Sequence, residues 1–190
     1  MFQIRPSRLK TTIAATIVAL AASLQPVAAA PSSFGNGVQL VGLDIQPGTY
    51  RSVNPGGGCY WERLSGVGGT MDEILANDNP RGPAIVTISP GDFAFSSSRC
   101  GEWSADLTPI TKSPTESFGD GDFMVGTEVA PGLWRSAGGS GCYWERLSGF
   151  NGTMDDIIAN DNQGPSGTVR IAASDVGFSS SRCGKWTKIG

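Results

Sequence analysis

Carboxylates are the main side chains in this sequence that could perform acid–base chemistry, because its 190 residues include no histidine. The lack of histidine excludes Ser-His-Asp and Cys-His catalysis and histidine metal sites. Two carboxylates are enough to hydrolyse a glycosidic bond, so a carboxylate-based glycan hydrolase is one hypothesis. The candidate acids occupy matching places in two repeated segments: Glu62, Asp72, Glu73, Asp78 and Asp92, then Glu145, Asp155, Asp156, Asp161 and Asp175.

Each of these acids also has a structural role that the sequence predicts. Asp72 and Glu73 fall in the first turn of an expected short helix, where negative charge is favoured. Asp78 and Asp92 fall in expected turns. The sequence contains no nucleophile elbow, phosphate-binding loop or dinucleotide fingerprint. It therefore favours a non-catalytic protein, although an enzyme stays open, and predicts no cofactor.

Clustered oxygen ligands raise the question of calcium. The run 77–79 and the Asp120-Gly-Asp122 segment both carry such ligands. Neither has the glycine and glutamate spacing of an EF-hand loop, and helix termination and turn formation explain both. The sequence therefore predicts no metal site.

Aromatic side chains are the better candidates for binding. Exposed tyrosine and tryptophan beside polar groups suit stacking on sugar rings or packing on a partner protein. The alternative is that Trp61 and Trp144 belong to small cores beside disulfides, which is the more common situation in domains of this size. The candidate binding residues are Tyr60, Trp61, Glu62, Arg63 and Trp103 in the first repeat and Tyr143, Trp144, Glu145, Arg146 and Trp186 in the second.

These candidates lie in an internal duplication, since the string Cys-Tyr-Trp-Glu-Arg-Leu-Ser-Gly at 59–66 recurs at 142–149. All the cysteines belong to the repeats, and an even number of cysteines in an exported chain indicates disulfides. Three pairings are possible, and the equal spacing within each repeat favours a bridge inside each one. Each bridge would contribute about 4 kcal/mol on the chain-entropy model. The favoured pairs are Cys59–Cys100 and Cys142–Cys183.

Alternating residues predict that each repeat is mainly β. In the segment 59–64, Trp61 and Arg63 face one side of a central strand, while Tyr60 and Glu62 face the other. Thr70 is expected to cap a short helix that ends at Asn77. Further strands are expected at 85–88 and 92–95 and at their copies.

The predicted fold is therefore two tandem, small, disulfide-closed domains resembling β-sandwiches or barrels, with one short helix each. The first repeat domain spans 34–103 and the second spans 118–190. Between them, 104–117 is a linker rich in Ser, Thr and Pro.

The N-terminal segment predicts export. Arg5, Arg8 and Lys10 precede an apolar stretch at 11–24 that is too short to span a bilayer, and small residues follow at 27–29. This pattern is typical of a signal peptide over 1–29, although an uncleaved anchor is an alternative. Cleavage would remove three of the 14 basic residues and leave 11 against 17 acidic ones, a net charge of −6. Such a chain repels phosphate backbones, so no nucleic-acid partner and no later membrane span are expected.

The repeated strings resemble a tandem repeat of exported and surface proteins of high-GC Gram-positive bacteria. The resemblance rests on Val-Gly-x-Asp/Glu-Ile/Val-x-Pro-Gly, the string at 59–66, Ile-x-Ala-Asn-Asp-Asn and Ser-Ser-Ser-Arg-Cys-Gly, and it covers nearly all of the expected mature chain. It implies a secreted, extracellular or cell-envelope location and supplies no catalytic or ligand residues.

The leading functional hypothesis is an exported, non-catalytic binding or envelope-associated protein, with cell-wall glycan or another surface protein as partner. Two copies of one site would add avidity for a repetitive surface. The alternatives are the glycan hydrolase and a structural spacer of the envelope.

Overall fold

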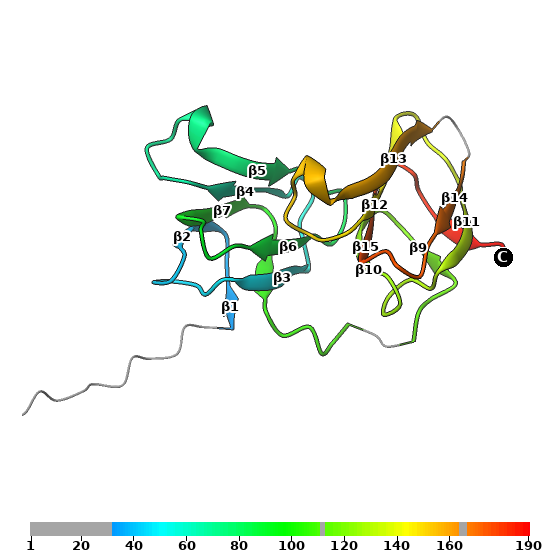
Figure 1. The fold of residues 1–190 in the computed structure, drawn as a ribbon, viewed down its shortest axis with the longest axis horizontal. Coiled ribbons are helices and arrows are strands. Elements are labelled where there is room, and N and C mark those ends of the chain that lie inside the picture. The colour runs from blue at the N-terminus through cyan, green and yellow to red at the C-terminus, as the bar shows by residue number, and fades with distance from the viewer. Residues whose placement is uncertain (1–31, 111–112, 164–166) are drawn as a thin grey trace, which may run out of the picture.

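A computed structural model describes residues 32–110, 113–163 and 167–190, so the expected signal peptide lies outside the described residues. Two β domains follow each other along the long axis of the molecule (Figure 1). We call strands β1 to β8, residues 33–104, domain 1, and strands β9 to β16, residues 117–188, domain 2. Within the described residues, no helix is both long enough and apolar enough to cross a bilayer.

Domain 1 consists of two four-stranded antiparallel sheets. Their strand orders are β1-β8-β3-β6 and β2-β7-β4-β5. A one-turn 3-10 helix, η1 (Met71–Glu73), precedes β5. The strands are β1 (Ser33–Phe34), β2 (Gly37–Leu40), β3 (Gly48–Val53), β4 (Tyr60–Leu64), β5 (Ile74–Asp78), β6 (Ile85–Ile88), β7 (Ala94–Ser98) and β8 (Glu102–Ser104).

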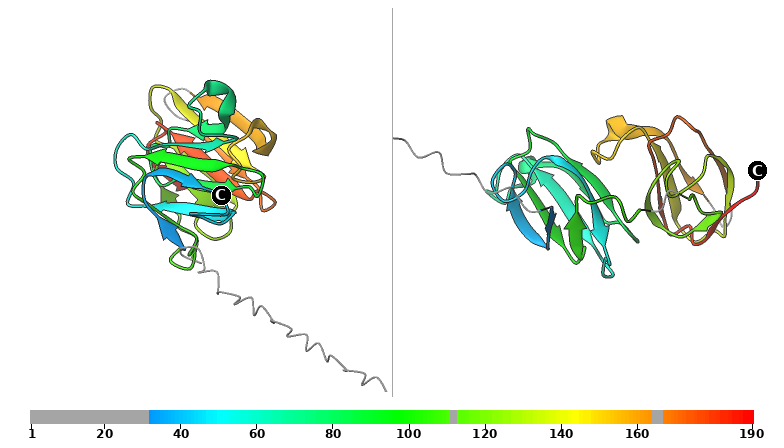
Figure 2. Two further views of the ribbon diagram at one scale, coloured as in Figure 1. Left: turned by 90° about the vertical axis from the view of Figure 1, so that its left-hand side faces the viewer. Right: turned by 90° about the horizontal axis from the view of Figure 1, so that it is seen from below.

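Domain 2 repeats this topology, with sheets ordered β14-β11-β16-β9 and β10-β15-β12-β13. Figure 2 shows the same layered arrangement in both domains. The prediction of two tandem, mainly-β domains is therefore confirmed. The elements are β9 (Ser117–Phe118), β10 (Gly121–Met124), β11 (Gly132–Ser136), β12 (Cys142–Leu147), η2 (Met154–Asp156), β13 (Ile157–Gln163), β14 (Thr168–Ile171), β15 (Gly177–Ser181) and β16 (Trp186–Lys188).

One disulfide closes each domain, Cys59–Cys100 in domain 1 and Cys142–Cys183 in domain 2. These are the pairs that the equal spacing favours. Each sulfur lies beside a tryptophan-centred core in which the aromatic rings meet edge to face.

The repeated serine run has a packing role. In domain 1 the fully buried Trp103 donates its indole N–H to Ser97 Oγ over 3.0 Å. In domain 2 Trp186 donates to Ser180 Oγ over 3.1 Å. Because a buried N–H without a partner is costly, a serine on the inner face of β7 or β15 satisfies the one polar atom of Trp103 and of Trp186.

The expected short helix is reduced to a single turn, and the prediction that Asn77 ends a helix is wrong. Ile74, which follows η1, is already extended, with φ −77° and ψ 111°, and Asn77 belongs to strand β5. The cause is tertiary, because β4 offers a hydrogen-bonding edge along which residues 74–78 pair. The Glu73 carboxylate closes the turn by accepting hydrogen bonds from the backbone N–H groups of Gly68 and Thr70. These bonds lower the pKa of Glu73.

Candidate functional site

The two domains meet through an edge strand. Strand β6 of domain 1 lies against the outer face of the β10-β15-β12-β13 sheet of domain 2. Its Thr87 N–H donates to Phe150 O over 2.7 Å, and its Ile85 N–H donates to Asp122 Oδ2 over 2.9 Å. The Ile85 side chain packs among Leu147 and Phe150, and all three are buried. The contact is thus an apolar centre flanked by backbone hydrogen bonds.

Two arginines of domain 1 bond to domain 2 at the edge of this contact. Arg51 on β3 pairs with Glu128 over 2.7 Å, and both side chains are largely buried. Arg63 on β4 donates Nη1 to the carbonyl of Asn151 over 2.6 Å, while its other nitrogens hold Asp92 at 2.7 Å. Each of these interactions joins a strand of domain 1 to a loop of domain 2. The arginines therefore hold the loops at 124–129 and 148–153 against domain 1.

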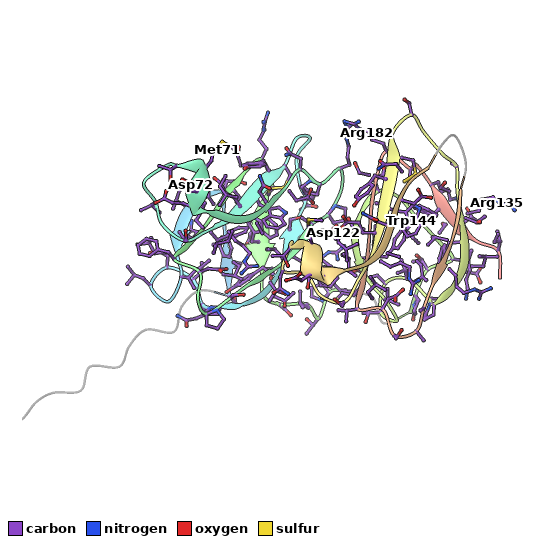
Figure 3. The ribbon with its side chains drawn as sticks, turned by 45° about the horizontal axis from the view of Figure 1, so that its top comes forward. Met71, Asp72, Asp122, Arg135, Trp144 and Arg182 are labelled. Carbon is purple, nitrogen blue, oxygen red and sulfur yellow. A yellow bond between two sulfur atoms is a disulfide. The ribbon has the colours of Figure 1, made fainter. Side chains whose placement is uncertain are left out.

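A cleft of about 600 Å³ runs between the domains beside this contact. Domain 1 contributes Trp61 and the end of β5 with the residues that follow, 77–80. Domain 2 contributes the outer faces of β10, β12, β13 and β15. Figure 3 shows Asp122 between the two domains. Carboxylates, amides and hydroxyls share the walls with apolar side chains such as Leu147, Phe150 and Met154.

Four carboxylates, Asp78, Asp122, Glu145 and Asp156, line the cleft against one arginine, Arg182, so the lining has a net negative charge when the acids are ionised. Asp122 is buried, and desolvation together with the charge of Asp78 raises its pKa to about 7. Desolvation and the same Asp78 charge raise the pKa of Glu145. Asp78 is accessible to solvent, but the cleft walls desolvate it enough to raise its pKa as well. Burial is the largest cause of all three raised pKa values, and repulsion from Asp78 adds to it at Asp122 and Glu145.

A tyrosine organises the polar wall on the side of domain 2. Tyr143 donates its hydroxyl to Glu145 and accepts the side-chain amide of Asn160 over 2.8 Å. Burial and the bond to Glu145 raise the pKa of Tyr143 to about 12. The phenol therefore stays neutral and holds Glu145 in a fixed orientation on the outer face of β12.

An indole N–H adds a further polar feature. Trp61 lines the cleft with only 2% of its surface exposed, and its Nε1 has no hydrogen-bond partner within the described residues. The counterpart Trp144 Nε1 shares this property. In domain 1 the six-membered ring approaches the 148–153 loop closely enough that a Cβ on Gly152 would lie 2.4 Å from Trp61 Cη2.

This arrangement suits recognition of a cation better than acid–base catalysis. The carboxylates are spread along the cleft, and the described residues include no group of three Cys, Asp or Glu placed to hold one metal ion. Asp122 already accepts a backbone N–H and is buried. Asp78 and Glu145 remain accessible and can accept hydrogen bonds from an ammonium or guanidinium group, which would also lower the mutual repulsion.

The structure divides the candidate binding residues by strand face. On β4 and β12 the aromatic-polar pairs Tyr60 with Glu62 and Tyr143 with Glu145 lie on the outer face, as the alternation predicts. The remaining candidates lie inward: Trp61, Arg63 and Trp103 in domain 1 and Trp144, Arg146 and Trp186 in domain 2, of which Arg146 is the most accessible.

Of these candidates, the cleft brings together Trp61, Tyr143 and Glu145. Tyr60 and Glu62 lie on the matching face of domain 1, outside the cleft. Trp103 and Trp186 have no exposed surface and are out of reach of a ligand.

Sequence reasoning misses the residues that join the domains. The sequence draws attention to Asp122 only as a possible calcium ligand, and no binding or catalytic pattern includes Phe150 or Asn151. A signal is present, because the first repeat has Val38, Val67 and Gly68 at these three positions. Differences between otherwise matching repeats mark the surfaces that the two copies do not use in the same way.

Gly152 provides a direct test of the domain contact. We expect Gly152→Ala to destabilise the protein by about 1–2 kcal/mol for its positive φ and by about 1–3 kcal/mol more for the clash with Trp61. The matched control is Gly69→Ala, whose φ is +78° against +71° and whose added Cβ would meet nothing within 4 Å. Chemical denaturation measures both variants. Equal losses would mean that Trp61 does not press on this loop in solution.

Together, the fold and the cleft define a class of protein: a two-domain, disulfide-closed β protein assembled by duplication, with a polar cleft where its copies meet. The family model described as the Rv1352-like extracellular domain matches residues 31–104 and again residues 115–187. The chain therefore belongs to this family, in two copies, and is an extracellular protein.

Similar proteins come from mycobacteria. The uncharacterized protein Rv1352 of Mycobacterium tuberculosis (strain H37Rv) and the uncharacterized protein Mb1387 of Mycobacterium bovis are each 33% identical to this chain over 82 residues. Each match covers 36% of this chain and 67% of the relative. No solved structure matches this chain.

Proposed function

We propose that this extracellular protein is a non-catalytic binding protein whose ligand carries a positively charged amino or guanidinium group, held in the cleft between the domains. The observation that carries the proposal is that Asp78 of domain 1 and Glu145 of domain 2 line one accessible cleft of about 600 Å³ and interact electrostatically across it. A cation placed between them would satisfy both carboxylates and would also hold the two domains together.

The remaining lining suits a ligand that makes hydrogen bonds and apolar contacts together. Amides from both domains, Asn77 and Asn160, border the cleft beside the Tyr143 hydroxyl, and the edge of the almost fully buried Trp61 lies at its wall. Neutral donors and acceptors beside an aromatic ring suit amine-bearing sugars and basic peptide side chains alike. Both chemistries occur at extracellular surfaces, so the experiment must separate them.

Calorimetry with the purified secreted protein tests this proposal. We expect a glucosamine oligomer or a lysine-containing peptide to bind, more tightly as pH rises through the carboxylate range and less tightly as salt increases. The N-acetylated oligomer and an acetyl-lysine peptide, which lack the charge, are expected not to bind. Binding of the oligomer alone would indicate a glycan ligand, and binding of the peptide alone would indicate a protein partner.

The duplication supplies a matched control. We expect Glu145→Gln to weaken binding about tenfold or more, because it removes one of the two accessible charges. Glu62→Gln changes the corresponding residue of domain 1, which lies outside the cleft, and should leave the affinity unchanged. Equal effects of the two variants would place the ligand elsewhere. Cleavage of the glucosamine oligomer that Glu145→Gln abolishes would replace the binding proposal by the hydrolase alternative.

A further inference from the structure

The contact between the two domains joins unlike surfaces. Domain 1 uses its edge strand β6, whereas domain 2 uses the outer face of its β10-β15-β12-β13 sheet. Because the domains are copies, each carries a version of both surfaces. Domain 1 retains an outer face on its β2-β7-β4-β5 sheet, and domain 2 retains the edge strand β14. A contact of this head-to-tail type can repeat between molecules.

The retained face of domain 1, which we call the open face, carries a cluster of exposed apolar side chains beside Glu62. Val38 and Val67 are 55% and 54% exposed, and Met71 is 85% exposed. With Ile74 and Leu64 they border a hollow of about 220 Å³. The counterparts of Val38 and Val67 in domain 2 are Asp122 and Phe150, which β6 covers. Exposed apolar side chains gathered in this way mark an interaction surface.

The retained edge of domain 2, which we call the open edge, carries the opposite charge to the rim of the open face. The open face is bordered by exposed Asp44 and Asp72, whereas Arg170 on β14 and Arg135 on the neighbouring strand β11 are exposed at the open edge. Figure 3 places Met71 and Asp72 at one end of the molecule and Arg135 at the other. Arg135 therefore faces outward where a second copy could approach.

The internal contact supplies a template for this charge pairing. Arg51 of domain 1 pairs with Glu128 of domain 2. In the repeat alignment, Arg135 of domain 2 corresponds to Arg51, and Asp44 of domain 1 corresponds to Glu128. Glu128 also accepts the backbone N–H of Met124, as Asp44 accepts that of Leu40, so the two acids are held in the same way. An Arg135–Asp44 pair between molecules would reproduce the internal one.

The backbone offers a second correspondence. Strands β6 and β14 are both edge strands of matching sheets. In β6 the outward N–H of Thr87 donates to the loop carbonyl of Phe150. The N–H of Arg170 occupies the same position in β14, and the loop carbonyl of Val67 occupies the corresponding place on the open face. Edge strands of this kind are ready to pair with another chain.

We propose that the open edge of one molecule docks on the open face of a second copy of this chain, so that the protein associates reversibly head to tail. The junction would place Val67 beneath β14 and pair Arg135 with Asp44. It would be weaker than the contact inside one chain, because Thr168 replaces the apolar Ile85 and because two free molecules lose translational freedom on association. Association would therefore depend on protein concentration.

Sedimentation velocity of the secreted protein, over a wide range of concentration, tests this inference. We expect the average mass to rise with concentration. Arg135→Glu at the edge and Val67→Asp on the face should each weaken association about tenfold or more, since each sets like charges or an unpaired charge in the contact. Val53→Asp, which changes an exposed valine outside both surfaces, should not.

Mixing the two variants, at a concentration where each alone is monomeric, gives the sharpest readout. The intact edge of the Val67→Asp chain can dock on the intact face of the Arg135→Glu chain. The edge and the face that remain free in this pair each carry an added acid, so they repel each other and no third molecule is added. A head-to-tail contact therefore predicts a one-to-one pair that grows no further, whereas a symmetric contact predicts that the mixture stays monomeric. A wild-type protein that is monomeric throughout, or a mixture that does not pair, would overturn the proposal.

Discussion

Replacing Arg63 by alanine is expected to destabilise the protein by about 3–5 kcal/mol. The guanidinium is buried and reaches both oxygens of Asp92 at 2.7 Å, Ser89 Oγ at 2.9 Å and the Asn151 carbonyl of domain 2 at 2.6 Å. Without it, Asp92 would remain as an unpaired buried charge. Thermal and chemical unfolding measure the loss.

The second repeat provides the control for Arg63. Arg146 holds Asp175 at almost the same distances, but its side chain is 22% exposed. We expect Arg146→Ala to cost about 1–3 kcal/mol, because the partly exposed space that Arg146 vacates lets water reach the buried Asp175. In the first repeat, the double variant Arg63→Met with Asp92→Asn should be more stable than Arg63→Ala alone, because no charge is left buried. Equal losses for the two arginines would show that the bond to Asn151 and the deeper burial of Arg63 contribute nothing.

The architecture can be predicted from the sequence because the strongest local signals agree with the tertiary structure. The alternation at 59–64 predicts the correct faces for Trp61 and Glu62, and the cysteine spacing corresponds to the pairs that form. The helix prediction at 70–77 fails because a pairing edge on β4 outweighs a capping pattern of only one turn.

The candidate site can be predicted only in part, because it lies between the repeats. The pattern within one repeat singles out Glu145 and Tyr143, but nothing local shows that domain 1 faces them across a cleft. Because the pattern within one repeat does not show the other domain, the sequence predicts only a turn position for Asp78. Asp78 is of functional interest because its charge acts on Glu145 of the other domain. Glu145 lies 67 residues further along the chain. Contacts between copies cannot be derived from the pattern within one copy.

The differences between the repeats nevertheless contain this information. Val38 and Asp122 occupy one position in the two sheets, and a buried acid is a poor choice there unless it has a partner. The partner is the backbone N–H of Ile85, which only domain 1 of the same chain provides. A comparison of the two repeats, position by position, therefore points to the domain contact from the sequence itself.

The stability of the folded protein is expected to fall as pH rises from about 4 to about 7, chiefly because of Asp122. Burial raises the pKa of this carboxyl to about 7, so in this range the folded state binds a proton that the unfolded state, with an ordinary aspartate, has already lost. A shift of this size corresponds to about 4 kcal/mol at most, since one pKa unit is about 1.4 kcal/mol. The raised pKa values of Asp78 and Glu145 act in the same direction.

Asp122→Asn isolates this effect. An asparagine can still accept the Ile85 N–H through its side-chain oxygen but cannot ionise, so above pH 7 the variant should be more stable than the wild type by about 2–4 kcal/mol. Its stability should also depend less on pH between 4 and 7, with the remaining slope due to Asp78 and Glu145. Asp72→Asn, a change of an exposed acid on η1, should reproduce the wild-type curve. Urea titrations at a series of pH values measure these differences. A wild-type curve that is flat or rises through this range, or an Asp122→Asn slope equal to that of the wild type, would show that Asp122 is ionised in the folded protein. In that case a cation or water must reach the floor of the cleft.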